Sequence, residues 1–323
     1  MEKIFEGVTG QNALRNLLSR SLDSGRISHA YIFEGDVGMG KKTLALSFAR
    51  HLVCENKTAC NLCRHCKLSL AGNHPDIITL TPDEGKQSIS VDNIRSLYET
   101  VMVKPFSADK KVIIIPGCEK MGVPAQNALL KMLEEPPSYV VFILLTTNSS
   151  YFLDTVLSRS IKLSFNPYTD EEIRKVLLSK GYLNVSEAVI SCADGNIGKA
   201  LSLVSSDTFL SMRKDLISLF DLFFDSKTSL FDIVSYFEKN KDSAEDIFDI
   251  LLYFARELVF LHLGGCPKDN DFNGTDYLDR TTLKGCMAFM NKIIEFRKML
   301  LSNANYSLLI NAFVFGSKEV LGW

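Results

Sequence analysis

The stretch Gly-Asp-Val-Gly-Met-Gly-Lys-Lys-Thr at residues 35–43 constrains the fold more than any other feature of the chain. It has the spacing G-x-x-x-x-G-K, with Gly35, Gly40 and Lys41 at the marked positions. A β-rich run leads into it and a helical pattern follows it. The glycines let consecutive backbone N–H groups point at phosphate oxygens, and the start of the next helix adds positive potential. The stretch therefore predicts a strand, a phosphate-binding loop (P-loop) and a helix.

Short β-rich runs recur through the first half of the chain, and helical patterns separate most of them. These runs cover residues 29–35, 76–82, 111–117, 139–147 and 160–165. Strands that alternate with helices predict an α/β fold with a parallel sheet covered on both faces. Beyond residue 166 the pattern is helical. We therefore expect an α/β core at residues 1–166, a small helical domain at 167–206 and an all-α domain at 207–323.

Composition and charge exclude some classes of protein. The chain has 323 residues, 46% of them apolar and 23% charged, which is ordinary for a globular protein. Its longest apolar run, residues 139–145, is too short to cross a bilayer, so we expect a cytoplasmic protein with no membrane contact. A net charge of -2 gives no general attraction to nucleic acid. Contact with DNA would need a local patch, for which Lys104, Lys110 and Lys111 are candidates, or a larger assembly.

The residue after the P-loop lysine departs from the active pattern. Lys41 would contact the β- and γ-phosphates of a nucleotide, and a Ser or Thr normally follows because its hydroxyl binds Mg²⁺. Lys42 takes that position, and Thr43 lies about 100° further round the helix. The sequence leaves open whether ATP or ADP binds here. The candidate residues of this degenerate nucleotide site are Gly35, Gly38, Gly40, Lys41, Lys42 and Thr43.

The run at residues 111–117 lacks the acids that ATP hydrolysis uses. In a P-loop ATPase this strand ends in an Asp that helps hold Mg²⁺, and a Glu that polarises the attacking water often follows. Here the strand leads into Pro116 and Gly117, and Glu119 comes two residues later. We interpret Glu119 as a solvated turn residue in preference to a displaced substitute.

Four cysteines lie within residues 54–66 with the spacing C-x₅-C-x₂-C-x₂-C. Four thiolates this close in a cytoplasmic chain predict a closed tetrahedral zinc site of structural type. The ligands are Cys54, Cys60, Cys63 and Cys66. We expect His65 and His74 to support the site or to lie at the surface. The other cysteines are predicted to be small core residues, and these are Cys118, Cys192, Cys266 and Cys286.

Several motifs in a fixed order carry a family resemblance. "RISHAYIFEGDVGMGK" leads into the P-loop and the cysteines follow its helix. Then come "NALLKMLEEPP" at residues 127–137 and "LSRS" at residues 157–160. Over about residues 5–205 the chain resembles the clamp-loader branch of the AAA+ superfamily, and in particular the subunits of the bacterial DNA polymerase III clamp loader. The resemblance implies an AAA+ core with the cysteine insert, a helical lid at 167–206 and a C-terminal collar for oligomerisation at 207–323.

The resemblance also implies a role for Arg159. "LSRS" is similar to the "SRC" motif of the family, with Ser160 in place of the cysteine. In clamp loaders this arginine contacts the ATP of a neighbouring subunit, where a guanidinium stabilises charge on the γ-phosphate. Arg159 is therefore predicted to be catalytic in trans. The alternative is that it only pairs with a local carboxylate.

Other positions depart from the family's active pattern. Residues 146–148 occupy the sensor-1 region, where a polar side chain would contact the γ-phosphate, but they could equally cap the strand end. Gly198 stands where the resemblance places a sensor-2 arginine, and Lys199 is next to it. Together with Lys42 and the missing acids, these departures predict a subunit with no ATPase activity of its own. The resemblance implies that such a subunit is the stator of a ring whose ATP-driven closure loads the clamp.

The implied partners are the clamp-loader gamma/tau and delta subunits, the sliding clamp, and primed DNA within the complex. The implied cofactors are structural Zn²⁺ and ATP or ADP held without hydrolysis. Three alternatives stay open: an active gamma/tau-like ATPase, a zinc-dependent nucleic-acid binder, and a P-loop enzyme of another class, against which "NALLKMLEEPP" argues. The sequence does not define the clamp-contacting face, the packing of the C-terminal helices or the position in the ring.

Overall fold

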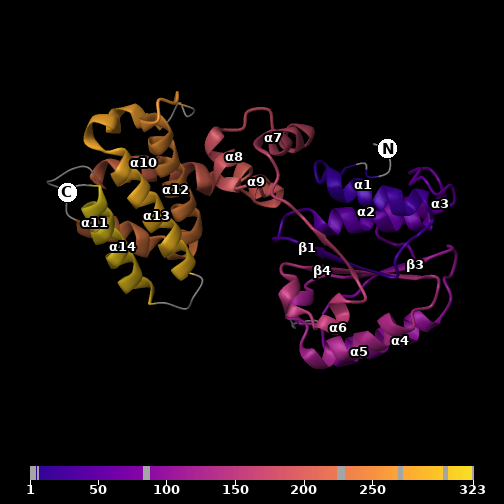
Figure 1. Ribbon diagram of the computed structural model, residues 1–323. Helices are drawn as coiled ribbons and strands as arrows, with labels where there is room; N and C mark the ends of the chain where they lie inside the picture. The colour runs from indigo at the N-terminus through magenta and orange to yellow at the C-terminus, as the bar shows by residue number, and fades with distance from the viewer. Residues whose placement is uncertain are drawn as a thin grey trace. The chain divides into compact units, whose positions relative to one another are not determined.

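The computed structural model describes residues 5, 7–82, 88–223, 230–267, 272–300 and 305–321. The chain forms two compact units. The first contains residues 1–172 and 196–198, and the second contains residues 173–195 and 199–323 (Figure 1). The boundaries of the three expected domains stay a prediction.

The first unit is built on a five-stranded parallel sheet with the order β2-β3-β4-β1-β5. The strands are β1 (Ala30–Glu34), β2 (Ile77–Thr79), β3 (Lys111–Ile115), β4 (Val140–Thr146) and β5 (Ile161–Ser164). Every residue of β3 and β4 is buried, as expected for parallel strands with helices on both faces. Glu34 pairs with both Thr146 and Ser164, so β1, β4 and β5 end at the same edge of the sheet.

Helices cover both faces of this sheet. In Figure 1, α1 (Asn12–Asp23), α2 (Lys41–Val53) and α3 (Arg64–Leu70) lie on one face. On the other face lie α4 (Val91–Met102), α5 (Val123–Glu134) and α6 (Asp154–Leu157). Successive side chains of β1 point to opposite faces of the sheet. Tyr31 packs edge-on against Phe48 of α2, and Ile32 belongs to the core beneath α4 and α5. The predicted α/β core is confirmed.

The second unit is helical in its described residues. Its helices are α7 (Asp170–Ser179), α8 (Glu187–Ala193), α9 (Ile197–Val204), α10 (Asp207–Phe223), α11 (Leu230–Lys239), α12 (Ala244–His262), α13 (Leu283–Leu300) and α14 (Tyr306–Val320), where the first residues of α7 and α9 belong to the first unit. Its core is rich in aromatic rings: Phe254 stacks on Phe272 at 4.1 Å between centroids, and Phe220 meets both rings edge-on. The predicted helical C-terminal region is confirmed.

Two details of the packing correct sequence-based expectations. Cys118, Cys192 and Cys286 are buried as expected, but Cys266 is exposed. Lys111 is only 4% exposed, and its ammonium donates to the carbonyl oxygens of Thr100 and Val103, at 2.8 and 2.6 Å. Lys111 therefore caps the end of α4 and is not available to DNA. Among the described residues, none of the helices has the length and apolar character needed to span a membrane.

Candidate functional site

The P-loop connects β1 to α2 with the backbone that its glycines predict. Gly38 and Gly40 have φ angles of 91° and 80°, in the left-handed region that favours glycine. The start of α9 packs directly on this loop: the Gly198 N–H donates to the Gly38 carbonyl at 3.0 Å, and the Asn196 amide donates to the Val37 carbonyl at 2.7 Å. A Cβ on Gly198 would lie 2.5 Å from the Gly38 Cα. The two glycines permit a contact that a sensor arginine at position 198 would prevent.

The ammonium of Lys41 is bonded to its own loop. It donates to the carbonyl oxygen of Gly35, and to that of Asp36 at 2.9 Å. Burial lowers the pKa of Lys41, an effect that the nearby carboxylates of Glu119 and Asp36 oppose. The ammonium of Lys41, which the sequence predicted to bind phosphate, therefore has carbonyl oxygens of the P-loop as its hydrogen-bond partners.

A cavity of about 450 Å³ opens beside this loop at the carboxyl ends of the strands. It brings together the P-loop, the turn after β3 and the end of β4. Its lining residues are Val37, Gly38, Gly40, Lys41, Lys42, Thr43, Pro116, Gly117, Glu119, Leu145, Thr146 and Thr147. The structure thus joins three regions that the sequence predicted separately: the P-loop, the position of the missing acids and the sensor-1 region.

Glu119 is more than the solvated turn residue that the sequence favoured. It is half-buried, lines the cavity, and accepts a hydrogen bond from the Thr147 backbone N–H at 3.2 Å. The chain reaches this position because Gly117, at a φ of 69°, turns it into a short 3₁₀ segment, Cys118–Lys120. Pro116 and Gly117 were the local signals for that turn.

The other sensor-1 residues cap the end of β4. The Thr146 hydroxyl donates to the Asn148 carbonyl at 2.9 Å and accepts from the Asn148 N–H at 3.2 Å. The Asn148 side chain accepts from the Ser150 N–H at 2.8 Å. Thr146 and Asn148 therefore cap the end of the strand, and both Thr146 and Thr147 also line the cavity.

Sequence reasoning missed Glu34, the last residue of β1. Its carboxylate accepts from the Ser149 N–H at 2.6 Å and the Ser164 hydroxyl at 3.0 Å, and it pairs with the Lys162 ammonium at 2.6 Å. Burial raises the pKa of Glu34, but these hydrogen bonds outweigh it and lower the pKa to about 2. The network ties β1 and β5 to the segment after β4. Its partners are far apart in the sequence, so no local pattern could have revealed it.

The four predicted cysteine ligands lie together after α2, with sulfur atoms within 4.8 Å of one another. The Cys54–Cys60, Cys54–Cys63 and Cys60–Cys66 sulfur distances are 3.7, 4.0 and 4.0 Å. A tetrahedral zinc with Zn–S bonds of about 2.3 Å needs sulfurs about 3.8 Å apart. The backbone N–H groups of Cys63 and Leu62 lower the pKa of Cys60 to about 6, which favours a thiolate there, whereas burial raises the pKa of Cys66. The donor set fits structural zinc.

His65 and His74 form a buried pair beneath the cysteines. The His65 Nδ1 and His74 Nε2 atoms are 2.8 Å apart, and His74 Nδ1 accepts from the Asp76 N–H. His74 therefore carries its proton on Nε2 and donates it to His65. The Asp76 carboxylate accepts the backbone N–H groups of Phe106, Ser107 and Ala108 at 2.6–3.0 Å. A polar chain thus runs from the cysteine insert to the turn after α4.

Arg159 lies just after α6 and is 36% exposed. Its Nη2 atom is 3.2 Å from the Glu134 carboxylate at the end of α5. Its Nη1 atom donates to the Thr155 carbonyl at 3.0 Å and the Ser158 hydroxyl at 3.4 Å. The local ion pair that the sequence left open is present, and it leaves the guanidinium accessible.

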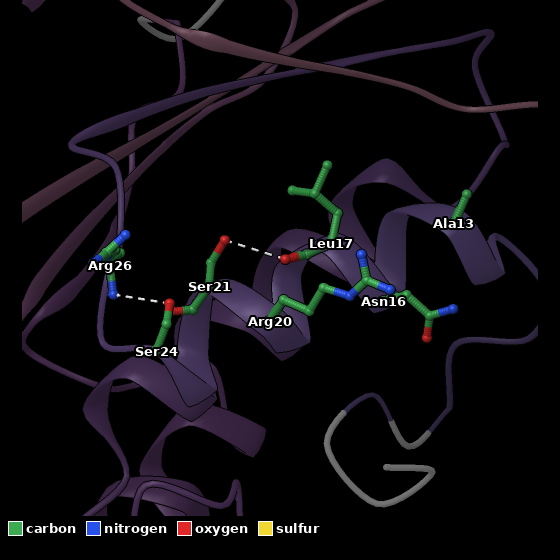
Figure 2. A pocket seen from close by; sticks show the side chains of 7 residues that line it. All are labelled: Ala13, Asn16, Leu17, Arg20, Ser21, Ser24 and Arg26. Atoms are coloured by element: carbon green, nitrogen blue, oxygen red, sulfur yellow. Dashed lines mark hydrogen bonds between the residues drawn. The ribbon is translucent and has the colours of Figure 1, made fainter.

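A larger cavity, of about 520 Å³, lies along α1 and the loop that follows it (Figure 2). Two of its serine hydroxyls have local backbone partners. The Ser21 hydroxyl donates to the Leu17 carbonyl at 3.1 Å, and the Arg26 N–H donates to the Ser24 hydroxyl at 3.4 Å (Figure 2). None of the predicted site residues lines it, so the cavity beside the P-loop is the better candidate for function.

A five-stranded parallel α/β core with a P-loop between β1 and α2 places the chain in the class of P-loop proteins. The family model "DNA polymerase III, delta subunit" matches residues 10–169. DNA polymerase III subunit delta' of Bacillus subtilis is 33% identical over 223 residues, which cover 68% of this chain and 67% of that protein. The chain belongs to the DNA polymerase III clamp-loader subunit family.

Relatives of both clamp-loader types occur. DNA polymerase III subunit tau of Bacillus subtilis is 34% identical over 67% of this chain, but the match spans only 39% of tau. Subunit delta' of Pseudomonas aeruginosa is 38% identical over 42% of each chain. Among solved structures, a gamma subunit-related protein of Thermotoga maritima has 18% identity and a TM-score of 0.49, with 95% of this chain and 98% of that chain covered. Family membership alone does not separate a hydrolysing from a non-hydrolysing role.

Proposed function

We propose that this chain is a delta'-like stator of the clamp loader, with no ATPase activity of its own, which supplies Arg159 to a neighbouring ATPase subunit. The observation that carries this proposal is the lining of the P-loop cavity. Two lysines, Lys41 and Lys42, face a space whose one lining carboxylate is Glu119. That carboxylate is already bonded to a backbone N–H. A Mg²⁺ ion needs oxygen ligands, and a cation at the metal position opposes it.

Nucleotide binding without hydrolysis is compatible with this cavity. ATP or ADP would be held by the backbone N–H groups of the P-loop and by Lys41, once its ammonium exchanged the Gly35 and Asp36 carbonyls for phosphate oxygens. The metal hydroxyl, the metal carboxylate, the catalytic Glu and the sensor-2 arginine act as a unit, so the loss of all four removes turnover. The close packing of Gly198 on Gly38 leaves no room for an arginine side chain at position 198, which supports the loss of the sensor.

The accessibility of Arg159 supports a role in trans. An exposed ion pair contributes little stability, so the guanidinium can exchange part of its contacts for the γ-phosphate of a neighbour's ATP. In this role the chain assembles with gamma/tau and delta subunits in the cytoplasm, through a collar of its C-terminal helices. The assembly loads the sliding clamp on primed DNA. Zinc, held by Cys54, Cys60, Cys63 and Cys66, would stabilise the insert and take no part in the chemistry.

One experiment tests the proposal directly. The chain is mixed with the ATPase subunit of its own assembly, and ATP turnover is compared for the native protein and Arg159→Ala. We expect turnover to fall at least about tenfold, since an arginine finger typically contributes far more than that. Unchanged turnover would show that Arg159 does not act in trans.

A second candidate is an active gamma/tau-like ATPase, which two cavity residues favour. Thr43 and Glu119 both line the cavity beside Lys41, where a hydroxyl and a carboxylate could take over the metal and water contacts. In that case the isolated chain would hydrolyse ATP, and Lys41→Ala would abolish the turnover.

A further inference from the structure

Among the described residues, Glu134 is the contact of Arg159 that comes from another element of the fold. Thr155 and Ser158 belong to the same short segment as the arginine, whereas Glu134 ends α5. The two residues before it, Met132 and Leu133, are buried in the core under the sheet. The end of α5 is therefore fixed relative to the sheet. The Glu134 carboxylate, through its ion pair, holds the Arg159 guanidinium near that end.

We propose that Glu134 is a positioning residue for Arg159. This inference rests on the proposed role of Arg159 in trans. An arginine has a long, flexible side chain, and it stabilises a developing charge only when it is already oriented. Holding the guanidinium between α5 and α6 restricts this freedom before the neighbour's nucleotide arrives.

The donor geometry leaves room for a phosphate. A guanidinium has five N–H donors, and the contacts with Glu134, Thr155 and Ser158 use one N–H each. The remaining two N–H donors are enough for a bidentate contact with phosphate oxygens. Arg159 can therefore keep Glu134 as a partner while it acts on the neighbouring subunit.

The exposure of the pair argues against a purely structural purpose. Arg159 and Glu134 are 36% and 51% exposed, and ion pairs this open add little to stability. Glu134→Ala should therefore fold normally, and its effect should appear in the activity of the assembly. Glu135 gives a matched control, because it is an exposed glutamate at the next position.

The test uses the full chain assembled with its ATPase subunit, and it measures kcat and KM for ATP. We expect Glu134→Ala to lower kcat about three- to tenfold with KM unchanged, because orientation of the finger affects the transition state more than substrate binding. Glu134→Gln keeps an acceptor oxygen at the same distance and should recover most of kcat. Glu135→Ala should behave as the native chain, and Arg159→Ala combined with Glu134→Ala should equal Arg159→Ala alone.

A second measurement reads the order of the side chain without the partner. NMR relaxation of the Arg159 Nε–H group in the isolated chain should show greater mobility in Glu134→Ala and native mobility in Glu134→Gln. Native kcat or raised kcat in Glu134→Ala, with Arg159→Ala still impaired, would overturn the positioning role alone. If Arg159→Ala itself has no effect, the role in trans is wrong and this inference fails with it.

Discussion

The P-loop lies at the N-terminal end of α2 and the cysteine cluster at its C-terminal end. The two motifs differ in how many of the residues that each needs for ligand binding are present. At the N-terminal end, the P-loop keeps its glycines, but Lys41 bonds to the loop's own carbonyls and Lys42 stands where a metal-binding hydroxyl was expected. At the C-terminal end, Cys54 begins a group of four cysteines whose sulfur atoms are close enough together to hold one metal ion. The P-loop keeps its shape through its packing on Gly198, whereas the cysteine insert has few side chains to hold it.

Removal of zinc from the C-terminal end of α2 should have the largest effect. Between Cys54 and Cys66 the buried apolar side chain is Ala59, and Leu62 is 77% exposed, so the proposed zinc would supply most of what holds the insert. We expect Cys60→Ser or Cys63→Ser to lose the metal and several kcal/mol of stability, or about 5–10 °C in Tm. Metal analysis and calorimetry measure the two effects. Cys266→Ser, outside the cluster, should change neither, and a zinc-free native protein would contradict the site.

Restoring an arginine at position 198 should disrupt the other end of α2. A Cβ there would meet the Gly38 backbone at 2.5 Å, so Gly198→Arg must separate α9 from the loop. We expect a loss of about 1–3 kcal/mol, typical of overpacking, visible as a lower Tm. Ile197→Arg adds the same charge one position earlier and should cost less. Equal effects would show that charge, and not the close backbone contact, decides the result.

The network at the end of β1 should make stability depend on acid. The folded pKa of Glu34, about 2, lies below its ordinary value near 4.5, so its contribution is present above that value and disappears as the pH falls through 2. Glu34→Gln should therefore be less stable than the native chain by roughly 1 kcal/mol at neutral pH, with a smaller difference as the pH approaches 2. Unfolding with denaturant across this pH range measures it, and Glu135→Gln is the exposed control. A constant difference at every pH would contradict the assignment.

The sequence predicted what depends on short-range spacing and periodicity. The strands, the P-loop glycines and the four clustered cysteines follow from residues close in the chain, and the structure brings each group together as expected. The features that sequence reasoning missed or misjudged depend on distant residues. Glu34 is held by Ser149 and Ser164, and Lys111 is buried because the end of α4 accepts its hydrogen bonds. No local pattern encodes which loops meet at the edge of a sheet.

The same distinction explains Glu119 and Arg159. Glu119 follows a glycine turn that is typical of exposed loops, but that turn folds back against the end of β4. The pairing of Arg159 with Glu134 joins two motifs that the sequence showed separately, "LEEPP" and "LSRS". Their adjacency depends on how α5 and α6 pack beneath the sheet, which no pattern within either motif specifies.

The smallest expected effect concerns Lys41, at the N-terminal end of α2, and it separates a working nucleotide site from a degenerate one. In a hydrolysing subunit this lysine is essential, but here its ammonium bonds to loop carbonyls and its pKa is lowered by burial. Lys41→Met should therefore change ATP turnover of the assembly by less than about twofold, while Arg159→Ala lowers it at least about tenfold. Binding of a fluorescent ADP to the isolated chain, native and Lys41→Met, shows separately whether the loop holds nucleotide. A loss of turnover in Lys41→Met as large as in Arg159→Ala would mean that the P-loop is a working site, and the active-ATPase candidate would replace the stator.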